Sequence, residues 1–400
     1  MRALIITNGN DFLKELKRIG CDERAFPIFQ KKTEIIPIKV DSLSSASANI
    51  LKQTALSLGA DCVIHQDVIR GRKKISSGII LATPRQYETF TLKLSSQYAT
   101  LKNLSEEIKD LLAINQKSAF IFRFCHQVYH LEKRVHIMGI LNLTPDSFYD
   151  GGRYLKPDEA LRQAEKMAEE GADFIDIGAE STRPGSKPIS AKEEIARLKP
   201  ILSLIKKKLK IPISCDTYKS AVADFALKEG CEIINDISAL RFDKKMAKLL
   251  AEKNAYCILM HIKGRPQTMQ KNPKYEDLMG EIYHYLKERI AFAQKEGIKG
   301  EKIIVDPGIG FGKRLDDNYE IIRRLKELRG LGKPILLGPS RKSFIGLTLN
   351  LPVEERLEGS LAACVLALIN GANILRVHDV KETKRAVKMA EAIIKGGKGV

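Results

Sequence analysis

The sequence lacks several features that would assign it to a class of protein directly. It has no tryptophan, and its seven cysteines are scattered without a Cys-x-x-Cys pair. This pattern favours neither a zinc ribbon nor a thioredoxin-like redox site, and reduced thiols in a cytoplasmic protein are expected. No apolar run reaches the roughly 18 residues that predict a membrane-spanning helix, and residues 1–10 are not typical of a secretory signal.

Length and charge narrow the classes further. A chain of 400 residues predicts two domains, and 44% hydrophobic residues are enough to bury a sizeable core. The 67 basic residues exceed the 49 acidic ones, giving a net charge of +18 that is spread along the chain. Such a balance suits either nucleic acid or small anionic substrates, and composition alone does not choose between them.

Residues 1–116 predict a small α/β domain. Apolar runs at 2–7, 35–40, 62–65 and 79–83 are typical of strands, and the patterns at 44–58 and 104–114 are typical of helices. Gly59 fits the end of the first helix. This segment contains no catalytic motif, so its role stays unknown.

From residue 117 onward the pattern changes. After a predicted hairpin at 119–131, eight apolar runs are each followed by a helical segment; they are residues 136–141, 174–178, 211–215, 232–235, 255–260, 302–305, 334–337 and 374–377. Eight β/α units in roughly 280 residues predict a TIM (β/α)8 barrel over residues 117–400. The alternative is an open doubly wound sheet, in which the number eight would have no special meaning.

Polar residues stand at the carboxyl ends of these runs, where TIM barrels place their active sites. Asp216, Asn235 and Asp306 would converge in the barrel mouth, and buried carboxylates there need hydrogen-bond donors. The edge of a pterin or a guanine offers paired N–H donors, and Lys342 would face the acceptor side of such a ring. The alternative for Asp216 is the N-cap of a helix that begins near Tyr218.

A second group of predicted site residues is cationic. The second group lies at or just after strands two, seven and eight, where barrels often bind phosphate; it contains Arg183, Arg341, Arg376 and His378. A phosphorylated or pyrophosphorylated substrate is therefore expected. Asn142 ends the first strand with a neutral oxygen, which would suit a Mg²⁺ ion that takes its other ligands from phosphate and water.

Two loops are better signals than a third, glycine-rich segment. Residues 143–152 and 181–187 are rich in Gly, Pro and Ser and are long enough to close over a substrate. Asp146 and Asp150 in the first loop are better explained as loop-capping residues than as ligands. Residues 308–313 are rich in glycine, but the spacing is not that of a phosphate-binding loop.

Six motifs resemble those of the dihydropteroate synthases. They are residues 138–152 (MGILNLTPDSFYDGG), 176–185 (DIGAESTRPG), 214–219 (SCDTYK), 234–238 (INDIS), 306–313 (DPGIGFGK) and 338–346 (GPSRKSFIG). Their order matches the family, over about residues 120–400. The resemblance implies a TIM barrel preceded by an N-terminal extension that some members carry. It also implies a step of folate biosynthesis, in which (7,8-dihydropterin-6-yl)methyl diphosphate and p-aminobenzoate give 7,8-dihydropteroate and diphosphate.

The same resemblance implies roles for individual residues. Those that would hold the pterin are Asp216, Asn235, Asp306 and Lys342, with Met260 packing on the ring. Those that would hold the pyrophosphate are Thr182, Arg376 and His378, with Asn142 binding Mg²⁺. Those that would form the p-aminobenzoate pocket are Arg183, Phe311, Ser343 and Lys342. Lys342, Asp216 and Asp306 are the expected catalytic residues, in a dissociative mechanism, and a homodimer is expected.

Two other functions compete with this one. A methyltetrahydrofolate-type pterin methyltransferase shares the barrel and the pterin carboxylates, but it has no use for the arginine-rich STRPG and SRK motifs. A non-catalytic pterin-binding or nucleic-acid-binding protein would use the basic surface. Against nucleic acid, the sequence has no RNA-binding signature and no basic patch with interleaved aromatic residues.

Overall fold

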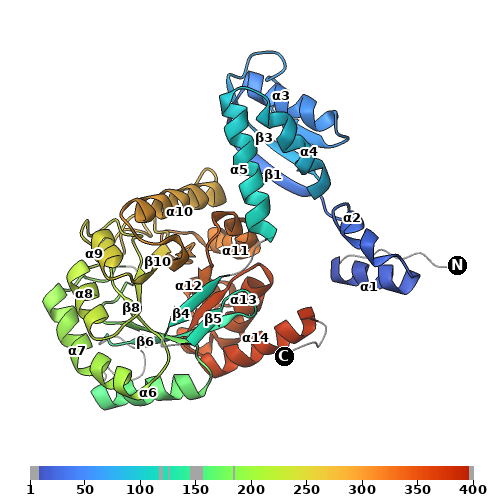
Figure 1. The fold of residues 1–400 in the computed structure, drawn as a ribbon. Coiled ribbons are helices and arrows are strands. Elements are labelled where there is room, and N and C mark those ends of the chain that lie inside the picture. Colours follow the sequence, from blue (N-terminus) through green and yellow to red (C-terminus); the bar gives the residue numbers. More distant parts are fainter. Residues whose placement is uncertain (1–8, 117–119, 125–126, 145–155, 183–184, 396–400) are drawn as a thin grey trace. The chain divides into compact units, whose positions relative to one another are not determined.

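The computed structural model describes residues 9–116, 120–124, 127–144, 156–182 and 185–395 (Figure 1). The chain divides into two compact units, Met1–Gln116 and Lys117–Val400. Each unit has its own hydrophobic core. In the described ranges, no helix is long and apolar enough to cross a membrane.

The N-terminal unit is built on a three-stranded antiparallel sheet. β1 (Ile36–Ser44) and β2 (Asp61–Ile64) both pair with the central strand β3 (Ile75–Ala82). Helices α3 (Ser45–Leu56) and α4 (Pro84–Ser95) contact the sheet, α5 (Ala99–Gln116) packs on α4, and all three bury apolar side chains in one core with the sheet. Two further helices precede the sheet, α1 (Gly9–Ile19) and α2 (Phe26–Gln30), with the short 3-10 helix η1 (Glu23–Ala25) between them. The strand predicted at 2–7 lies outside the described residues.

The second unit contains eight parallel strands. They are β6 (His136–Asn142), β7 (Phe174–Gly178), β8 (Ile213–Asp216), β9 (Ile233–Asp236), β10 (Tyr256–Met260), β11 (Ile303–Asp306), β12 (Leu336–Leu337) and β13 (Ile374–Val377). Their order in the sheet is β11-β10-β9-β8-β7-β6-β13-β12, and a parallel bridge between Val305 and Ile335 joins the two ends. The predicted TIM barrel is confirmed, and the open doubly wound sheet is not observed.

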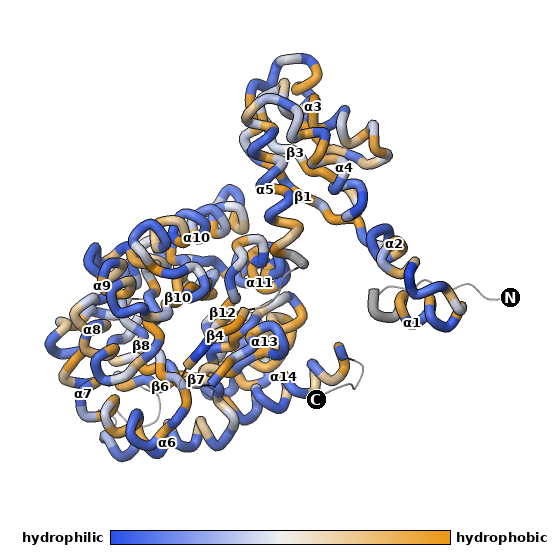
Figure 2. Tube along the Cα trace, in the orientation of Figure 1, coloured by the Kyte–Doolittle hydropathy of each residue, from blue (hydrophilic) through white to orange (hydrophobic). Residues whose placement is uncertain are grey.

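Helices surround the barrel on its outside. They are α6 (Pro157–Glu169), α7 (Ala191–Lys208), α8 (Ser220–Lys228), α9 (Met246–Glu252), α10 (Leu278–Lys295), α11 (Leu315–Arg323), α12 (Ser343–Leu349), α13 (Leu357–Ile369) and α14 (Val380–Lys395), with 3-10 helices η2 (Gly300–Lys302), η3 (Leu325–Leu331) and η4 (Val353–Glu355). Hydrophilic and hydrophobic residues alternate along these outer helices (Figure 2), as expected where one helix face packs on the barrel.

The barrel strands place alternate side chains inside and outside the barrel. Those that face the helices, such as Ile137 and Ile175, belong to the main core. Those that face the barrel axis near the amino ends of the strands form a second apolar cluster, which includes Met138, Phe174 and Ile304. The interior of the barrel therefore begins with an apolar layer.

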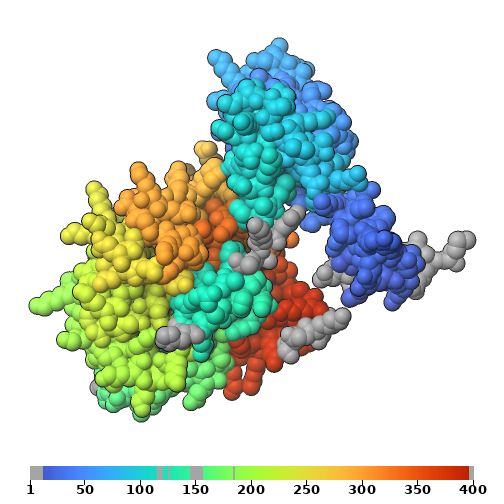
Figure 3. All heavy atoms as spheres, in the orientation of Figure 1, coloured from blue at the N-terminus to red at the C-terminus, as the bar shows by residue number. Residues whose placement is uncertain are grey.

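An antiparallel hairpin closes that layer. β4 (Ile121–Phe124) and β5 (Gln127–His130) pair with each other, and Phe122, Phe124 and Tyr129 pack on the same apolar cluster. Figure 3 shows the hairpin as the green-blue segment that covers the barrel on the viewer's side. Because this end is sealed, the site must open at the carboxyl ends of the strands.

Candidate active site

Polar side chains occupy the inward positions one step further along the strands. Two residues after the apolar Phe174, Ile233, Ile304 and Ile374 come four polar residues: Asp176, Asn235, Asp306 and Arg376. Asp176, Asn235 and Asp306 are buried. We call this set, together with Asp216 at the end of β8, the polar layer. It lies directly above the apolar layer.

Arg376 connects two carboxylates of the polar layer. Its Nε donates to Asp176 Oδ2 at 2.6 Å, and its Nη2 donates to Asp216 Oδ2 at 3.0 Å. Asn235 Nδ2 also donates to Asp176 Oδ2, at 3.1 Å. The structure thus brings together three residues selected from the sequence, Asp216, Asn235 and Arg376. It adds Asp176, the first residue of the 176–185 motif, which was not assigned to the site from the sequence.

Asp216 is not a helix cap. Helix α8 begins at Ser220, and its N-cap residue is Lys219, without a side-chain cap. Burial raises the pKa of Asp216 to about 7; the charge of Arg376 opposes this rise and that of Asp176 adds to it. A ligand that brings N–H donors would therefore stabilise the charged form of this carboxyl group.

Asp306 and Lys342 form the other side of the site. Asp306 Oδ1 accepts the backbone N–H of Gly308 at 2.7 Å, and burial raises the pKa of Asp306. Lys342 follows β12, donates to the carbonyl of Ile309 and lies 4.7 Å from the ring centroid of Phe311. Burial lowers the pKa of Lys342 to about 8, with the charge of Asp306 opposing the shift.

An apolar wall stands beside these charges. Met260, at the end of β10, packs in a cluster with Ile237, Ile262 and Met269, and Phe311 packs against that cluster. Met260, which the family resemblance assigned to the pterin ring, and Phe311, which it assigned to the p-aminobenzoate pocket, therefore lie in one cluster. A flat ring placed here would meet apolar atoms on a face and polar groups at its edge.

A buried contact between Lys313 and His261 supports the wall. His261 was expected to orient a neighbour, but Lys313 was not predicted as that neighbour. Lys313 Nζ lies 2.8 Å from His261 Nδ1 and 3.2 Å from the carbonyl oxygens of His261 and Phe311. Burial lowers the pKa of both side chains well below their usual values. Lys313 thereby fixes the loop after β11 to the end of β10, next to Met260.

The predicted cationic cluster is only partly present. Arg341 makes a two-point ion pair with Asp379, at 2.8 and 2.7 Å, and donates to the carbonyls of Val353 and Glu354. The expectation that Arg341 joins a phosphate site is therefore wrong, because its guanidinium connects the segment after β12 to Asp379 and to the backbone at residues 353–354. His378 Nδ1 lies 3.1 Å from Ser340 Oγ. Arg183, Asp146 and Asp150 lie outside the described residues.

The remaining predicted residues stand at the carboxyl ends of strands. Thr182 is half-buried after β7, and Ser343 is exposed at the start of α12, next to Lys342. Asn142 is half-buried at the end of β6 and faces Gly178, where an added Cβ would lie 3.8 Å from its side-chain oxygen.

Asn142 fits a metal only as one of several ligands. Within the described ranges, no group of three or more His, Cys, Asp or Glu residues could hold an ion. Mg²⁺ commonly keeps several waters and binds substrate phosphates beside few protein oxygens. The single amide oxygen of Asn142 is compatible with that mode of binding.

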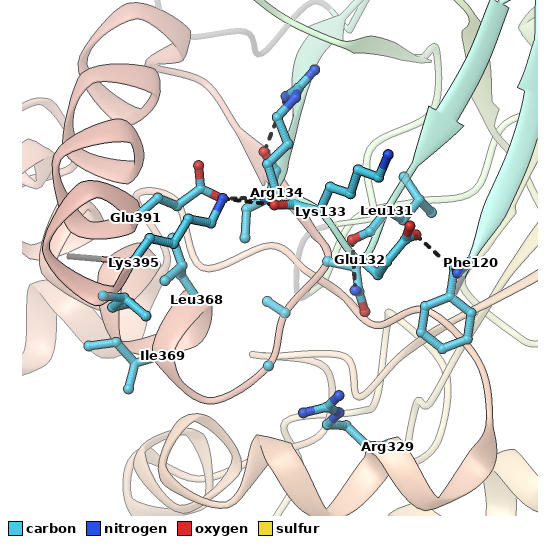
Figure 4. Close-up of a pocket in the computed structure, with 15 residues that line it drawn as sticks. Phe120, Leu131, Glu132, Lys133, Arg134, Arg329, Leu368, Ile369, Glu391 and Lys395 are labelled. Carbon is cyan, nitrogen blue, oxygen red and sulfur yellow. Dashed lines mark hydrogen bonds between the residues drawn. The ribbon is translucent and has the colours of Figure 1, made fainter. Parts of the chain in front are cut away.

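A pocket of about 330 Å³ lies at the opposite end of the barrel (Figure 4). Its lining includes Lys133–Val135 before β6, Asn373 before β13, and Glu391 and Lys395 of α14. Glu391 accepts the backbone N–H of Val135 at 2.7 Å, and Lys395 donates to the carbonyl of Lys133 at 2.8 Å. No residue of the polar layer lines this pocket, so it is separate from the candidate active site.

Comparison with known proteins agrees with this geometry. The family model described as pterin binding enzyme matches residues 138–378. A dihydropteroate synthase of Clostridium beijerinckii is 48% identical over 268 residues, which cover 67% of this chain and 97% of the relative. The solved Yersinia pestis dihydropteroate synthase in a sulfonamide drug complex superposes with a TM-score of 0.66 and 40% identity, covering 69% of this chain and 99% of that one.

One relative extends further along the chain. A Haloferax volcanii protein named as a probable bifunctional folylpolyglutamate synthase/dihydropteroate synthase is 36% identical over 354 residues. The match covers 86% of this chain and 42% of the relative. It is too long to fit within residues 117–400, so it includes part of the N-terminal unit. By the family match and by these relatives, the chain belongs to the pterin-binding enzymes and, among them, to the dihydropteroate synthase family.

Proposed function

We propose that the polar layer is the pterin site of this dihydropteroate synthase. The enzyme joins (7,8-dihydropterin-6-yl)methyl diphosphate to p-aminobenzoate and releases diphosphate. The observation that carries the site assignment is the convergence of Asp216, Asn235 and Asp306 above a sealed apolar layer, with Lys342 beside them. These groups match a flat heterocycle with N–H donors on one edge and acceptors on another.

In this proposal Asp216 and Asp306 accept N–H groups of the pterin, while Lys342 donates to its acceptor edge. Met260 supplies the apolar contact for the pterin ring, and Phe311, which packs against the same cluster, stands on the p-aminobenzoate side. The two carboxylates also favour positive charge on the ring system. Since burial raises the pKa of both carboxyl groups, ring N–H donors restore the charged form when the substrate enters.

The pyrophosphate side of the site is assigned to Thr182, Arg376 and His378. Arg376 is held by Asp176 and Asp216 in this structure, so its Nη2 contact with Asp216 has to be exchanged when the pterin takes that carboxylate. A Mg²⁺ ion held by Asn142 and the diphosphate oxygens would neutralise part of the charge on the leaving group.

The order of bond changes follows from these charges. The bond between the pterin methylene carbon and the diphosphate oxygen breaks first, and the electron pair leaves with diphosphate. The methylene cation is delocalised into the ring beside the two carboxylates. The p-aminobenzoate is held by Arg183, Phe311, Ser343 and Lys342. Its amine nitrogen then forms the new carbon–nitrogen bond and releases one proton to solvent. No protein nucleophile is required.

Two wider assignments are part of the proposal. A homodimer is supported by exposed apolar side chains on the neighbouring helices α13 and α14, among them Leu366, Ile369, Met389 and Ile393. Light scattering of the purified chain tests it.

A cytoplasmic location is supported by the free cysteines, of which Cys62, Cys215, Cys231, Cys257 and Cys364 are buried.

The reaction itself is tested with both substrates and Mg²⁺. Diphosphate release should require p-aminobenzoate, and mass spectrometry should detect 7,8-dihydropteroate in equal amount. Chelation of the metal should slow release. Diphosphate release that is independent of p-aminobenzoate, or no release at all, would contradict the assignment.

A further inference from the structure

Asp176 lies at the centre of the polar layer, although it does not stand at a strand end. It occupies the third position of β7, is fully buried, and faces the barrel axis beside Ser214 of β8. Its Oδ2 receives two hydrogen bonds, from Asn235 Nδ2 and from Arg376 Nε. Its Oδ1 is buried and has no hydrogen-bond partner among the described residues.

The contact with Asn235 determines which way the amide of Asn235 points. Asp176 Oδ2 already accepts from the Arg376 guanidinium, which can only donate. The same oxygen therefore accepts from the NH₂ group of Asn235 as well. The carbonyl oxygen of Asn235 is then turned away from Asp176 and is left to accept an N–H group of a ligand.

The contact with Arg376 anchors one edge of the guanidinium. Nε is held by Asp176 at 2.6 Å, whereas Nη2 reaches Asp216 at the longer distance of 3.0 Å. A pterin that binds Asp216 can replace Arg376 Nη2 as the donor to that carboxylate, while the hydrogen bond from Arg376 Nε to Asp176 stays in place. Arg376 then stays within the site and can turn its outer edge toward the pyrophosphate.

We propose that Asp176 is a positioning residue of the pterin site, which orients the Asn235 amide as an acceptor and holds Arg376 through its Nε. The inference rests on the proposed pterin site and goes beyond it, because Asp176 acts through two neighbours. It predicts that removing the Asp176 acceptor weakens binding and turnover of the pterin substrate, while the affinity for p-aminobenzoate stays unchanged.

Two substitutions separate the parts of this role. Asp176→Leu has similar size but no acceptor, so both Asn235 and Arg376 lose their partner. The KM for the pterin substrate should rise about tenfold or more and kcat should fall, while the KM for p-aminobenzoate changes less than about twofold. Asp176→Asn keeps an oxygen for the two donors but removes the charge, so it should recover part of the loss.

Ser214→Ala is the matched control. Ser214 pairs with Asp176 across β7 and β8, and its buried hydroxyl also lacks a hydrogen-bond partner in the described part of the chain. This variant changes the same region of the barrel interior without touching the carboxylate, and its kinetic constants should stay near those of the parent enzyme.

The outcomes decide the proposal clearly. An unchanged pterin KM and kcat in Asp176→Leu would overturn it. Equal losses toward both substrates, with lower thermal stability, would assign Asp176 to folding alone. If Asp176→Leu does not fold, Asp176→Asn is compared with Arg376→Gln and with the double variant. The two losses should then be less than additive, and full additivity would contradict the link through Arg376.

A binding measurement separates this proposal from the proposed reaction. Titration with 6-hydroxymethyl-7,8-dihydropterin does not depend on turnover. The parent chain should bind it, and Asp176→Leu should bind it about tenfold more weakly. Equal affinity in the two proteins would overturn the role of Asp176 even if the parent enzyme is active.

Discussion

On the scale of single residues, two of the groups expected to face the pterin have pKa values near neutral pH. Burial brings the pKa of Asp216 to about 7 and that of Lys342 to about 8. The carboxylate form of Asp216 is lost as the pH falls below 7, and the cationic form of Lys342 is lost as the pH rises above 8. The kcat/KM for the pterin substrate should therefore peak between these values and fall on both sides.

The acid side of this profile has a specific control. In Asp216→Asn the group at position 216 no longer titrates, so the remaining acid limb belongs to the other raised carboxyl group, Asp306. The limb should change its midpoint in residual activity measured over the same pH range. An identical acid limb in the variant would show that Asp216 does not control it.

Lys342 is the residue whose loss should be most costly. In Lys342→Ala, the donor to the pterin and the neighbour of p-aminobenzoate both disappear, and kcat/KM should fall by about a hundredfold or more. The fold should remain, because among the described residues the ammonium group makes one hydrogen bond, to the carbonyl of Ile309, and no ion pair. Circular dichroism and thermal unfolding check the fold, with Lys326→Ala in η3 as the control. Near-normal activity would refute the role.

The sequence located part of the site for a simple reason. Asp216, Asn235 and Asp306 lie at or next to the carboxyl ends of apolar runs, and a barrel gathers such positions at one end. Asp176 was not assigned to the site because it lies within a strand, and its inward direction follows only from the pairing register. Arg341 was assigned wrongly because the sequence does not show that its side chain turns to Asp379.

At the scale of elements, the β4–β5 hairpin is the closure of the barrel. Phe124 is buried and packs edge-on against Phe174 of β7, with ring centroids 5.7 Å apart. Phe124→Ala should lower the free energy of unfolding by about 3–5 kcal/mol, because a large cavity would open in the apolar layer. Denaturant titration measures the change.

The same hairpin provides the comparison. Val128 faces solvent, so Val128→Ala should change the free energy of unfolding by less than about 0.5 kcal/mol. Since neither side chain reaches the polar layer, both variants should keep their kcat/KM at temperatures where they are folded. Comparable destabilisation by the two substitutions would contradict the closure role.

Barrel strands were predictable because their residues are apolar on both faces near the amino ends. β7 and β13 have the predicted bounds, whereas β12 contains only Leu336 and Leu337. Helix α4 was missed although its start carries a signal. Thr83 and Gln86 form a capping box around Pro84. Helices α1 and α2, which precede β1, were missed as well, and of these α2 has only five residues.

On the scale of the whole molecule, the candidate active site and the additional N-terminal residues belong to different units of the chain. The N-terminal core and the barrel cores share no residue, and every residue assigned to the polar layer belongs to Lys117–Val400. The Clostridium beijerinckii relative matches over 97% of its own length with 67% of this chain. A complete dihydropteroate synthase therefore corresponds in length to the barrel unit alone.

A chain that starts at Lys117 should accordingly fold and catalyse. Its apolar layer, hairpin and polar layer are all retained, so kcat/KM for both substrates should stay within a few-fold of the full-length value. Steady-state assays and thermal unfolding of the two proteins measure this. Arg376→Gln in the shortened chain is the control for site-dependent activity. A folded but inactive barrel would show that residues 1–116 contribute to catalysis, and an unfolded one would show that the two units are not independent.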